Sequence, residues 1–142
     1  SEMCIRDRDM EFGYRTSVIK KRPFIVVQVE MELQPGNQEE IAAKMTELNR
    51  RRRDKQPLQY PSAGSTFKRP QGYFAGKLIM DAGLRGYSIG GACVSEKHCG
   101  FIINKNHASA ADVAEVICEV QERVKEKFGV TLETEVILLG DF

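Results

Sequence analysis

Residues 100–129, GFIINKNHASAADVAEVICEVQERVKEKFG, contain the clearest structural signal in the chain. Their opening apolar run predicts a strand over residues 100–104. Ser109 with Asp112 three residues later is typical of a helix N-terminus, and Gly129 is the expected C-terminal cap. Between these caps the apolar side chains recur at helical spacing and form one stripe, made of Val113, Val116, Val120 and Val124. A strand followed by a helix with a single apolar face predicts a helix packed on a sheet.

The sequence around this stretch supplies further elements. Residues 73–82 predict a short helix closed by Gly83, residues 87–94 predict a second strand, and residues 131–139 predict a last one. Residues 54–71 contain three prolines, a glycine and several small polar residues. They are therefore expected to form an ordered loop with no regular element. Together these patterns predict an α+β fold, a small sheet with helices packed on one face.

Two more elements are expected nearer the N-terminus. Residues 24–33 alternate between apolar and polar side chains, which predicts a half-buried strand. After a Pro-Gly turn, Asn37 and Glu40 resemble a capping box. Apolar side chains at helical spacing then predict an amphipathic helix that continues to about Arg53.

We place a domain boundary at the Pro-Gly turn. Residues 37–142 then form one domain, and residues 9–36 are the last part of a preceding α+β domain. Residues 1–8, SEMCIRDR, show neither helical nor strand periodicity and are interpreted as a non-native leader.

The composition excludes several classes of protein. Twenty-one Lys and Arg nearly balance 20 Asp and Glu, so the net charge of +1 provides no general field for nucleic acid or an acidic membrane. The run of arginines at 50–53 closes a helix, where cations meet the helix dipole favourably. No apolar run is long enough to span a bilayer, which predicts a soluble, intracellular protein. The cysteines are expected to be free thiols, and the spacing of Cys93, His98 and Cys99 matches no common zinc site.

Residues 61–70, PSAGSTFKRP, are the most informative candidate site. Gly64 allows close approach of a ligand to the backbone, Ser65 supplies a hydroxyl, and Lys68 with Arg69 can hold an anion. From these residues alone, an anion-binding loop and an ordinary solvated turn both remain open. Glu135 is either exposed or partly desolvated on its strand, and desolvation would raise its pKa.

Three separated motifs resemble those of the UDP-N-acetylenolpyruvoylglucosamine reductase family in order and spacing. They are FGYRTS at 12–17, PSAGSTFKRP at 61–70 and LETEV at 132–136. Further matching segments lie between them: FAGKLI at 74–79, LRG at 84–86, IGGA at 89–92 and GFIIN at 100–104. The resemblance covers residue 9 to the end. The short passage over residues 33–37 leaves no room for the inserted segment of the longer family type, so the chain resembles the compact type.

The resemblance implies a cytoplasmic flavoprotein oxidoreductase of peptidoglycan synthesis, and so a role in cell wall biogenesis, cell shape and cell division. In this family, FAD takes a hydride from NADPH and passes it to UDP-N-acetylglucosamine enolpyruvate, which gives UDP-N-acetylmuramate. Ser65 is then the proton donor, and Arg15 and Glu135 flank the substrate carboxylate. Substrate-binding positions carried over from the family are Lys55, Lys68, Arg85 and His98. Cofactor-binding positions are Tyr14, Arg15 and Gly64, and no metal is implied.

The same resemblance limits what this chain can do by itself. The FAD-binding domain of the family lies mostly N-terminal to the first motif, so the chain alone is expected to be inactive, while the full-length enzyme acts as a monomer. Ile137 stands where many relatives have a basic residue, so no phosphate contact is expected there. Two other interpretations are a free-standing module that binds a nucleotide sugar without catalysis, and a structural or interaction fragment that binds neither ligand.

Overall fold

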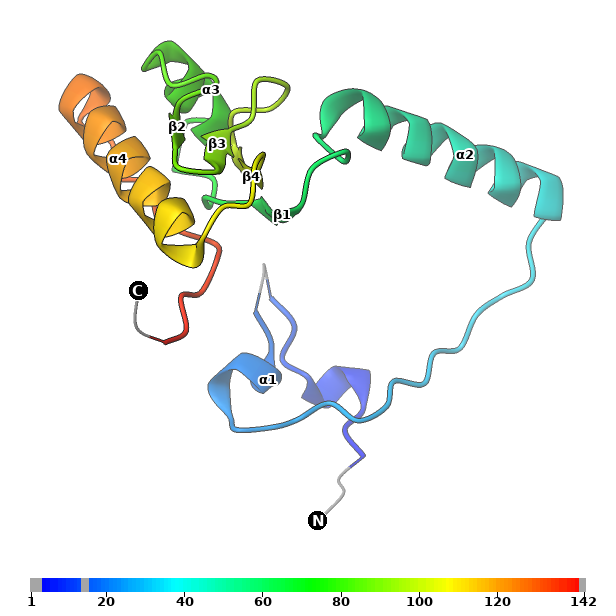
Figure 1. Ribbon diagram of the computed structural model, residues 1–142. Coiled ribbons are helices and arrows are strands. Elements are labelled where there is room, and N and C mark those ends of the chain that lie inside the picture. The colour runs from blue at the N-terminus through cyan, green and yellow to red at the C-terminus, as the bar shows by residue number, and fades with distance from the viewer. Residues whose placement is uncertain (1–3, 14–15, 141–142) are drawn as a thin grey trace. The chain divides into compact units, whose positions relative to one another are not determined.

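The computed structural model describes residues 4–13 and 16–140, which divide into two compact units that adjoin in sequence at Asn37 and Gln38 (Figure 1). The first unit contains a turn of 3-10 helix, η1 (Asp7–Asp9), and a single turn of α-helix, α1 (Val18–Lys21). Val18 is buried, and its N–H donates to the Met10 carbonyl at 2.8 Å. This one side chain anchors the small unit.

Residues 24–33 do not form the strand that their alternation predicts. The side chains of Ile25 and Val27 are 90% and 83% exposed, and the backbone has no regular structure. A strand is stable only when its N–H and C=O groups bond to a neighbouring strand. No described residue pairs with this segment. The alternation therefore indicates a partner that the described residues do not supply.

The second unit is built around a four-stranded antiparallel sheet with the strand order β1-β4-β3-β2. Its strands are β1 (Ser62–Ser65), β2 (Ser88–Ile89), β3 (Ala92–Val94) and β4 (Phe101–Asn104). Its helices are α2 (Gln38–Lys55), α3 (Ala75–Asp81) and α4 (Ala110–Phe128). Figure 1 shows α4 and α3 beside the sheet. The predicted α+β class, a small sheet with packed helices, is confirmed.

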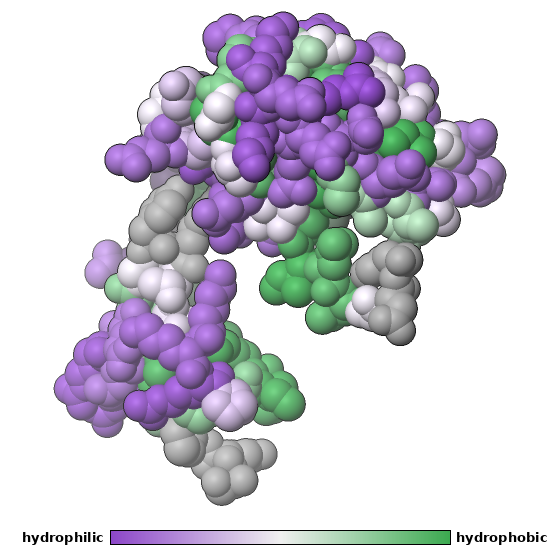
Figure 2. All heavy atoms as spheres, turned by 90° about the vertical axis from the view of Figure 1, so that its left-hand side faces the viewer, coloured by the Kyte–Doolittle hydropathy of each residue, from purple (hydrophilic) through white to green (hydrophobic). Residues whose placement is uncertain are grey.

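The core lies between α4 and one face of the sheet. Along α4 the predicted stripe is buried: Val116, Val120 and Val124 have no exposed surface, and Val113 is partly buried. On the sheet these side chains meet Ala92, Val94 and Ile102. The alternate strand residues Cys93, Phe101 and Ile103 point to the opposite face and pack with Tyr60. The outward face of α4, toward the viewer in Figure 2, is predominantly hydrophilic.

Both predicted caps of α4 are confirmed. The Ser109 hydroxyl accepts the Asp112 N–H at 3.1 Å, and the Asp112 carboxylate accepts the Ser109 N–H at 2.9 Å. At the other end Gly129 adopts φ +68° and its N–H donates to the Lys125 carbonyl at 2.8 Å. A positive φ favours glycine, which explains why the helix ends there.

The capping carboxylate makes the stability of the fold depend on pH. Backbone hydrogen bonds from Ser109 and then from Gly91 lower the pKa of Asp112. In the unfolded chain the pKa of an aspartate is about 3.9. The stabilisation is therefore complete above that pH and is lost as the pH falls through the lower, folded value. We expect the difference in unfolding free energy between the unsubstituted chain and Asp112→Asn, measured with urea, to shrink as the pH falls below about 4. A constant difference from neutral to acidic pH would contradict this.

The segment 87–94 is a hairpin and not the single strand predicted. Strands β2 and β3 pair as Ser88 with Cys93 and Ile89 with Ala92, so Gly90 and Gly91 form a two-residue turn between them. Gly90 adopts φ +51°. Such turns require positive φ, and a Gly-Gly pair between short apolar runs is itself a hairpin signal. The sequence prediction missed this hairpin signal because mainly apolar residues on both sides of the two glycines look like one continuous strand.

Two further boundaries differ from the prediction. Residues 54–71 are not free of regular structure, because α2 extends to Lys55 and β1 pairs with β4 inside the predicted loop. The short helix α3 is also shorter than the predicted 73–82. The amphipathic helix α2 forms as expected, yet no residue of it is buried. Its apolar side chains Ile41, Met45 and Leu48 are each at least half exposed.

The last segment, residues 131–139, is extended but is not the predicted strand. Its one bridge joins Thr134 to Phe67. The predicted alternation still orders the inner part of the segment, because Leu132 is buried, Thr134 and Val136 are half-buried, and Glu133 is exposed. No helix among the described residues is long and apolar enough to cross a membrane.

Burial predicts opposite effects for two leucines of this segment. Leu132 is completely buried in the main core, whereas Leu139 is 82% exposed. We expect Leu132→Ala to lower the unfolding free energy by about 3 kcal/mol, through lost burial and the cavity left behind. Leu139→Ala is expected to change it by less than about 0.5 kcal/mol. Urea unfolding curves of both variants measure this, and similar values for the two would contradict the docking of the segment.

Candidate functional site

Ser65 stands at the end of an edge strand. In β1, Ser62 pairs with Ile103 and Ser65 with Phe101, with an irregularity between the two pairs. Gly64 lies at this irregularity with φ +89°, and a Cβ placed on it would meet no atom within 4 Å. The Ser65 side chain is exposed, and its hydroxyl makes one long hydrogen bond, 3.4 Å, to the Phe67 carbonyl. The hydroxyl is thus presented beside bare backbone.

Backbone pairing brings the C-terminal segment to this strand end. The Glu135 N–H donates to the Thr66 carbonyl at 2.9 Å. Thr66 is itself buried: its N–H donates to the Gly100 carbonyl at 2.8 Å, and its hydroxyl accepts the Ile102 N–H at 3.2 Å. The residue after Ser65 therefore bonds to β4 on one side and to Glu135 on the other. Two of the sequence-predicted catalytic residues, Ser65 and Glu135, lie on adjacent stretches of backbone.

Lys68 belongs to the same pairing. Its N–H donates to the Glu133 carbonyl at 2.8 Å, and its ammonium group contacts the Glu133 carboxylate at 3.0 Å. Both side chains are mostly exposed, so this ion pair contributes little stability. A ligand phosphate can compete for the ammonium group at small cost.

His98 reaches the same place from the turn between β3 and β4. A Cβ on Gly100 would lie 3.0 Å from the imidazole Cε1 and 3.7 Å from the Ser65 hydroxyl oxygen. A Cβ on Gly76, in α3, would lie 3.3 Å from the same Cε1. The imidazole therefore lies against Gly76 and Gly100, and the Ser65 hydroxyl lies near Gly100 as well. Sequence reasoning missed the two glycines, although both stand inside segments that carry the family resemblance.

The hydrogen bonding of His98 defines its donor. Its Nδ1 accepts the Gly100 N–H at 3.1 Å, so the neutral ring carries its proton on Nε2. The ring edge also contacts Phe101, with centroids 5.1 Å apart. The Nε2–H remains a donor for a ligand near Ser65.

The remaining predicted substrate residues are exposed cations. Lys55 is the last residue of α2. Arg85 follows α3, and its guanidinium contacts the Met80 sulfur at 3.1 Å. The Gly86 N–H donates to the Val94 carbonyl at 3.0 Å, which places this turn at the end of β3 from which His98 follows. Tyr14 and Arg15, predicted to bind cofactor and substrate, lie outside the described residues.

The two cysteines weighed as metal ligands belong to different faces of the sheet. Cys93 packs in the cluster with Phe101, whereas Cys99 belongs to the main core. Burial raises the pKa of the Cys93 thiol, and a protonated thiol is a poor metal ligand. Among the described residues, no group of three or more ligating side chains could hold a metal ion.

Residues 56–139 match the family model described as UDP-N-acetylenolpyruvoylglucosamine reductase, C-terminal domain. The match takes in more than half of the chain, and the chain belongs to this family. The resemblance drawn from the three motifs is confirmed.

Individual relatives agree with the family. The chain is 60% identical over 139 residues to the UDP-N-acetylenolpyruvoylglucosamine reductase of Lachnoclostridium phytofermentans, covering 98% of this chain and 45% of that protein. It is 56% identical to the protein of the same name from Caldanaerobacter subterraneus subsp. tengcongensis, with coverages of 98% and 46%. The crystal structure of the Thermus caldophilus reductase is similar with a TM-score of 0.73 and 38% identity, covering 90% of this chain and 45% of that one. The chain thus spans about half the length of the relatives it matches.

Proposed function

We propose that this chain is the C-terminal, catalytic part of an NADPH-dependent flavoprotein oxidoreductase that converts UDP-N-acetylglucosamine enolpyruvate to UDP-N-acetylmuramate. The protein would act in the cytoplasm as a monomer and serve peptidoglycan synthesis, and thereby the cell wall, cell shape and cell division. The observation that carries the proposal is the hydrogen bond from the Glu135 N–H to the Thr66 carbonyl. It brings two widely separated family motifs together beside the exposed Ser65, which belongs to the first of them.

Ser65 would donate the proton that completes the reduction. When bound, FAD would supply a hydride, taken from NADPH, to C3 of the enolpyruvyl group. Charge then accumulates at C2 and on the adjacent carboxylate, and the Ser65 O–H transfers its proton to C2. An alcohol is a weak acid, but a carbanion-like enolate is a strong base, so a positioned hydroxyl is sufficient. The weak 3.4 Å contact with Phe67 leaves this proton free to be redirected.

Arg15 and Glu135 would stabilise the substrate carboxylate as its charge grows. An arginine acts electrostatically. A charged glutamate would repel the substrate, so the role requires Glu135 to be protonated or hydrogen-bonded to it. The Glu135 side chain is exposed in the described part of the chain. In the complete enzyme, substrate and the rest of the protein would cover this side chain.

The uridine diphosphate portion would be held by exposed cations and by the His98 Nε2–H. The cations proposed are Lys55, Lys68 and Arg85. Lys68 is the best supported, because it lies on the same backbone pairing as Ser65 and Glu135. Lys55 and Arg85 are assigned to substrate binding by the family resemblance alone.

The described residues fit a flat cofactor ring at one point. Gly64 leaves the backbone beside Ser65 without a side chain, and nothing within 4 Å occupies the space of its missing Cβ. A planar ring system can therefore approach this strand closely. Tyr14 and Arg15 would complete the contact, and most of the FAD site would belong to a preceding domain.

Comparison of two proteins tests the proposal. The complete protein that carries this sequence as its C-terminal part is expected to retain FAD and to oxidise NADPH in repeated turnovers only when the enolpyruvyl substrate is present, with formation of UDP-N-acetylmuramate detected by mass spectrometry. The present chain alone is expected to retain no FAD and to oxidise no NADPH. Binding of UDP-sugars by a complete protein that lacks flavin and turnover would instead support a nucleotide-sugar-binding module.

A further inference from the structure

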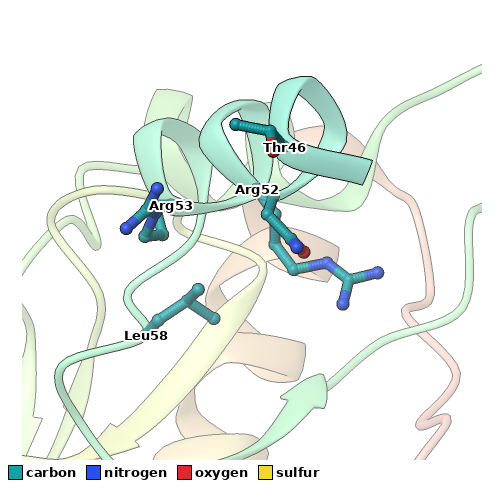
Figure 3. Close-up of a pocket in the computed structure, with 5 residues that line it drawn as sticks. Thr46, Arg52, Arg53 and Leu58 are labelled. Carbon is teal, nitrogen blue, oxygen red and sulfur yellow. The ribbon is translucent and has the colours of Figure 1, made fainter. Parts of the chain in front are cut away.

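The two arginines that line an open hollow at the C-terminal end of α2 do not converge on one point. The hollow has a volume of about 520 Å³ and is lined by Thr46, Asn49, Arg52, Arg53 and Leu58. Figure 3 shows the side chains of Arg52 and Arg53 on opposite sides of it. A more closely bonded arrangement lies at the irregularity of β1, directly before Ser65.

The irregularity in β1 is a β-bulge with one extra residue. From Ser62 to Ser65 the strand advances by three residues, whereas their partners on β4, Ile103 and Phe101, are two residues apart. Two residues of β1, Ala63 and Gly64, therefore lie opposite the single residue Ile102. A bulge of this kind re-aims the side chains that follow it, because side chains alternate between the two faces of a sheet.

The extra residue decides the face of the sheet on which Ser65 emerges. Side chains of directly paired residues lie on the same face, so Ser65 shares the face of Phe101 and Ile103. Without the extra residue, Ser65 would stand opposite Gly100 and share the face of Ile102, which is buried in the main core with α4. The bulge therefore turns the Ser65 side chain away from that core, and the side chain is exposed.

The Thr66 side chain bonds to the backbone at this bulge. Its hydroxyl accepts the Ile102 N–H at 3.2 Å, and the residue is only 3% exposed. Its backbone is held at the same time, because its N–H donates to the Gly100 carbonyl at 2.8 Å and its carbonyl accepts the Glu135 N–H at 2.9 Å. These three hydrogen bonds fix Thr66 against β4 and against the C-terminal segment, and with it the register of Ser65.

We propose that Thr66 is a positioning residue for proton transfer, whose hydroxyl holds the β1 bulge and so keeps the Ser65 hydroxyl on the open face of the sheet. The proposal rests on the proposed function of Ser65 as proton donor. A reacting group must be held closely, since a misplacement of about 1 Å can lower a rate about 10²-fold. Valine has nearly the shape of threonine but offers no acceptor to the Ile102 N–H, so Thr66→Val isolates the hydroxyl.

Hydrogen exchange of the Ile102 amide in the present chain, followed by NMR, tests the hydrogen bond directly. The exchange is expected to be about tenfold faster in Thr66→Val, which corresponds to the loss of one hydrogen bond. Thr66→Ser keeps a hydroxyl and is expected to exchange within about twofold of the unsubstituted chain. Unchanged exchange in Thr66→Val would overturn the proposal. This measurement needs neither flavin nor turnover, so its result does not depend on the proposed function.

Rates of the two half-reactions in the complete protein test the positioning role. Thr66→Val is expected to slow reduction of the enolpyruvyl substrate about tenfold, the effect of a shift smaller than about 1 Å, and to leave flavin reduction by NADPH unchanged. Thr66→Ser is expected to restore the rate to within about twofold. The matched control is Thr134→Val, which removes a threonine hydroxyl from the C-terminal segment opposite Phe67 and is expected to change both rates less than about twofold.

Equal slowing of both half-reactions by Thr66→Val, or no recovery in Thr66→Ser, would show a general structural role and refute the proposal. Absence of turnover in the unsubstituted complete protein would instead count against the proposed function. The bulge itself can be checked without a variant, because directly opposed residues bring their α-hydrogens close together. A nuclear Overhauser contact is expected between the α-hydrogens of Ser65 and Phe101, and a contact of Phe101 with Gly64 in its place would refute the bulge.

Discussion

Under the proposed function, replacement of Ser65 by alanine in the complete protein is expected to slow reduction of the enolpyruvyl substrate by about 10²- to 10⁴-fold, the usual contribution of a positioned general acid. Oxidation of NADPH in the absence of substrate is expected to continue at the unsubstituted rate, because no proton from Ser65 is needed for it. Rapid mixing that follows the two half-reactions separately measures both rates. The contrast between them is the signature of a proton donor.

Ser62→Ala is the matched control. Ser62 is a second exposed serine on the same edge strand, and its hydroxyl accepts the Gly64 N–H at 3.4 Å. Its loss is expected to leave both half-reactions within about twofold, since surface substitutions of this kind have small effects. If Ser65→Ala slowed both half-reactions equally, its role would be structural and the assignment as proton donor would be wrong.

Gly91→Ala is expected to destabilise the domain by at least about 5 kcal/mol, which exceeds most single substitutions and equals the whole stability of many domains. A Cβ at this position would lie 2.0 Å from the Asn106 carbonyl oxygen and 2.4 Å from the Ala108 nitrogen. Both are backbone atoms, so no side-chain rotation relieves the overlap. The variant is expected to lack a cooperative urea transition, measured by circular dichroism.

Gly129→Ala is the control that distinguishes steric overlap from backbone strain alone. Gly129 has φ +68°, but nothing lies within 4 Å of the position of its missing Cβ. The cost expected for a left-handed alanine is about 1–2 kcal/mol, with a cooperative transition retained. Equal destabilisation by the two substitutions would mean that the β2–β3 turn does not pack against residues 106–108 as described.

The helix α4 could be predicted from sequence because its determinants are local. Ser109, Asp112 and Gly129 act on backbone groups within a few residues, and the buried stripe follows from helical spacing alone. Pairing partners of strands are not local. Residues 24–33 have a strand pattern without a described partner, and residues 131–139 pair at a single bridge. Alternation shows which side chains would face inward, but not whether a neighbouring strand is present.

In the candidate site, too, local features could be predicted from the sequence and contacts between distant segments could not. The hydroxyl of Ser65 could be recognised in its loop, but the residues alone favoured an ordinary solvated turn, and the family motifs were needed to connect it with Glu135. The position of His98 against Gly76 and Gly100 depends on how α3 packs against the turn before β4. No spacing in the sequence encodes that contact.

The backbone hydrogen bonds that join residues 66–68 to residues 133–135 can form only late in the synthesis of the chain. A ribosome makes Ser65 long before Glu135, so the nascent chain carries the serine on a strand whose outer partner has not yet been synthesised. Strand β4 can pair with β1 in that interval, but Thr66 and Lys68 must wait for the late segment. A chain truncated before Glu133 would therefore contain all four strands and α4, but it would lack the hydrogen bonds that residues 66–68 make with residues 133–135.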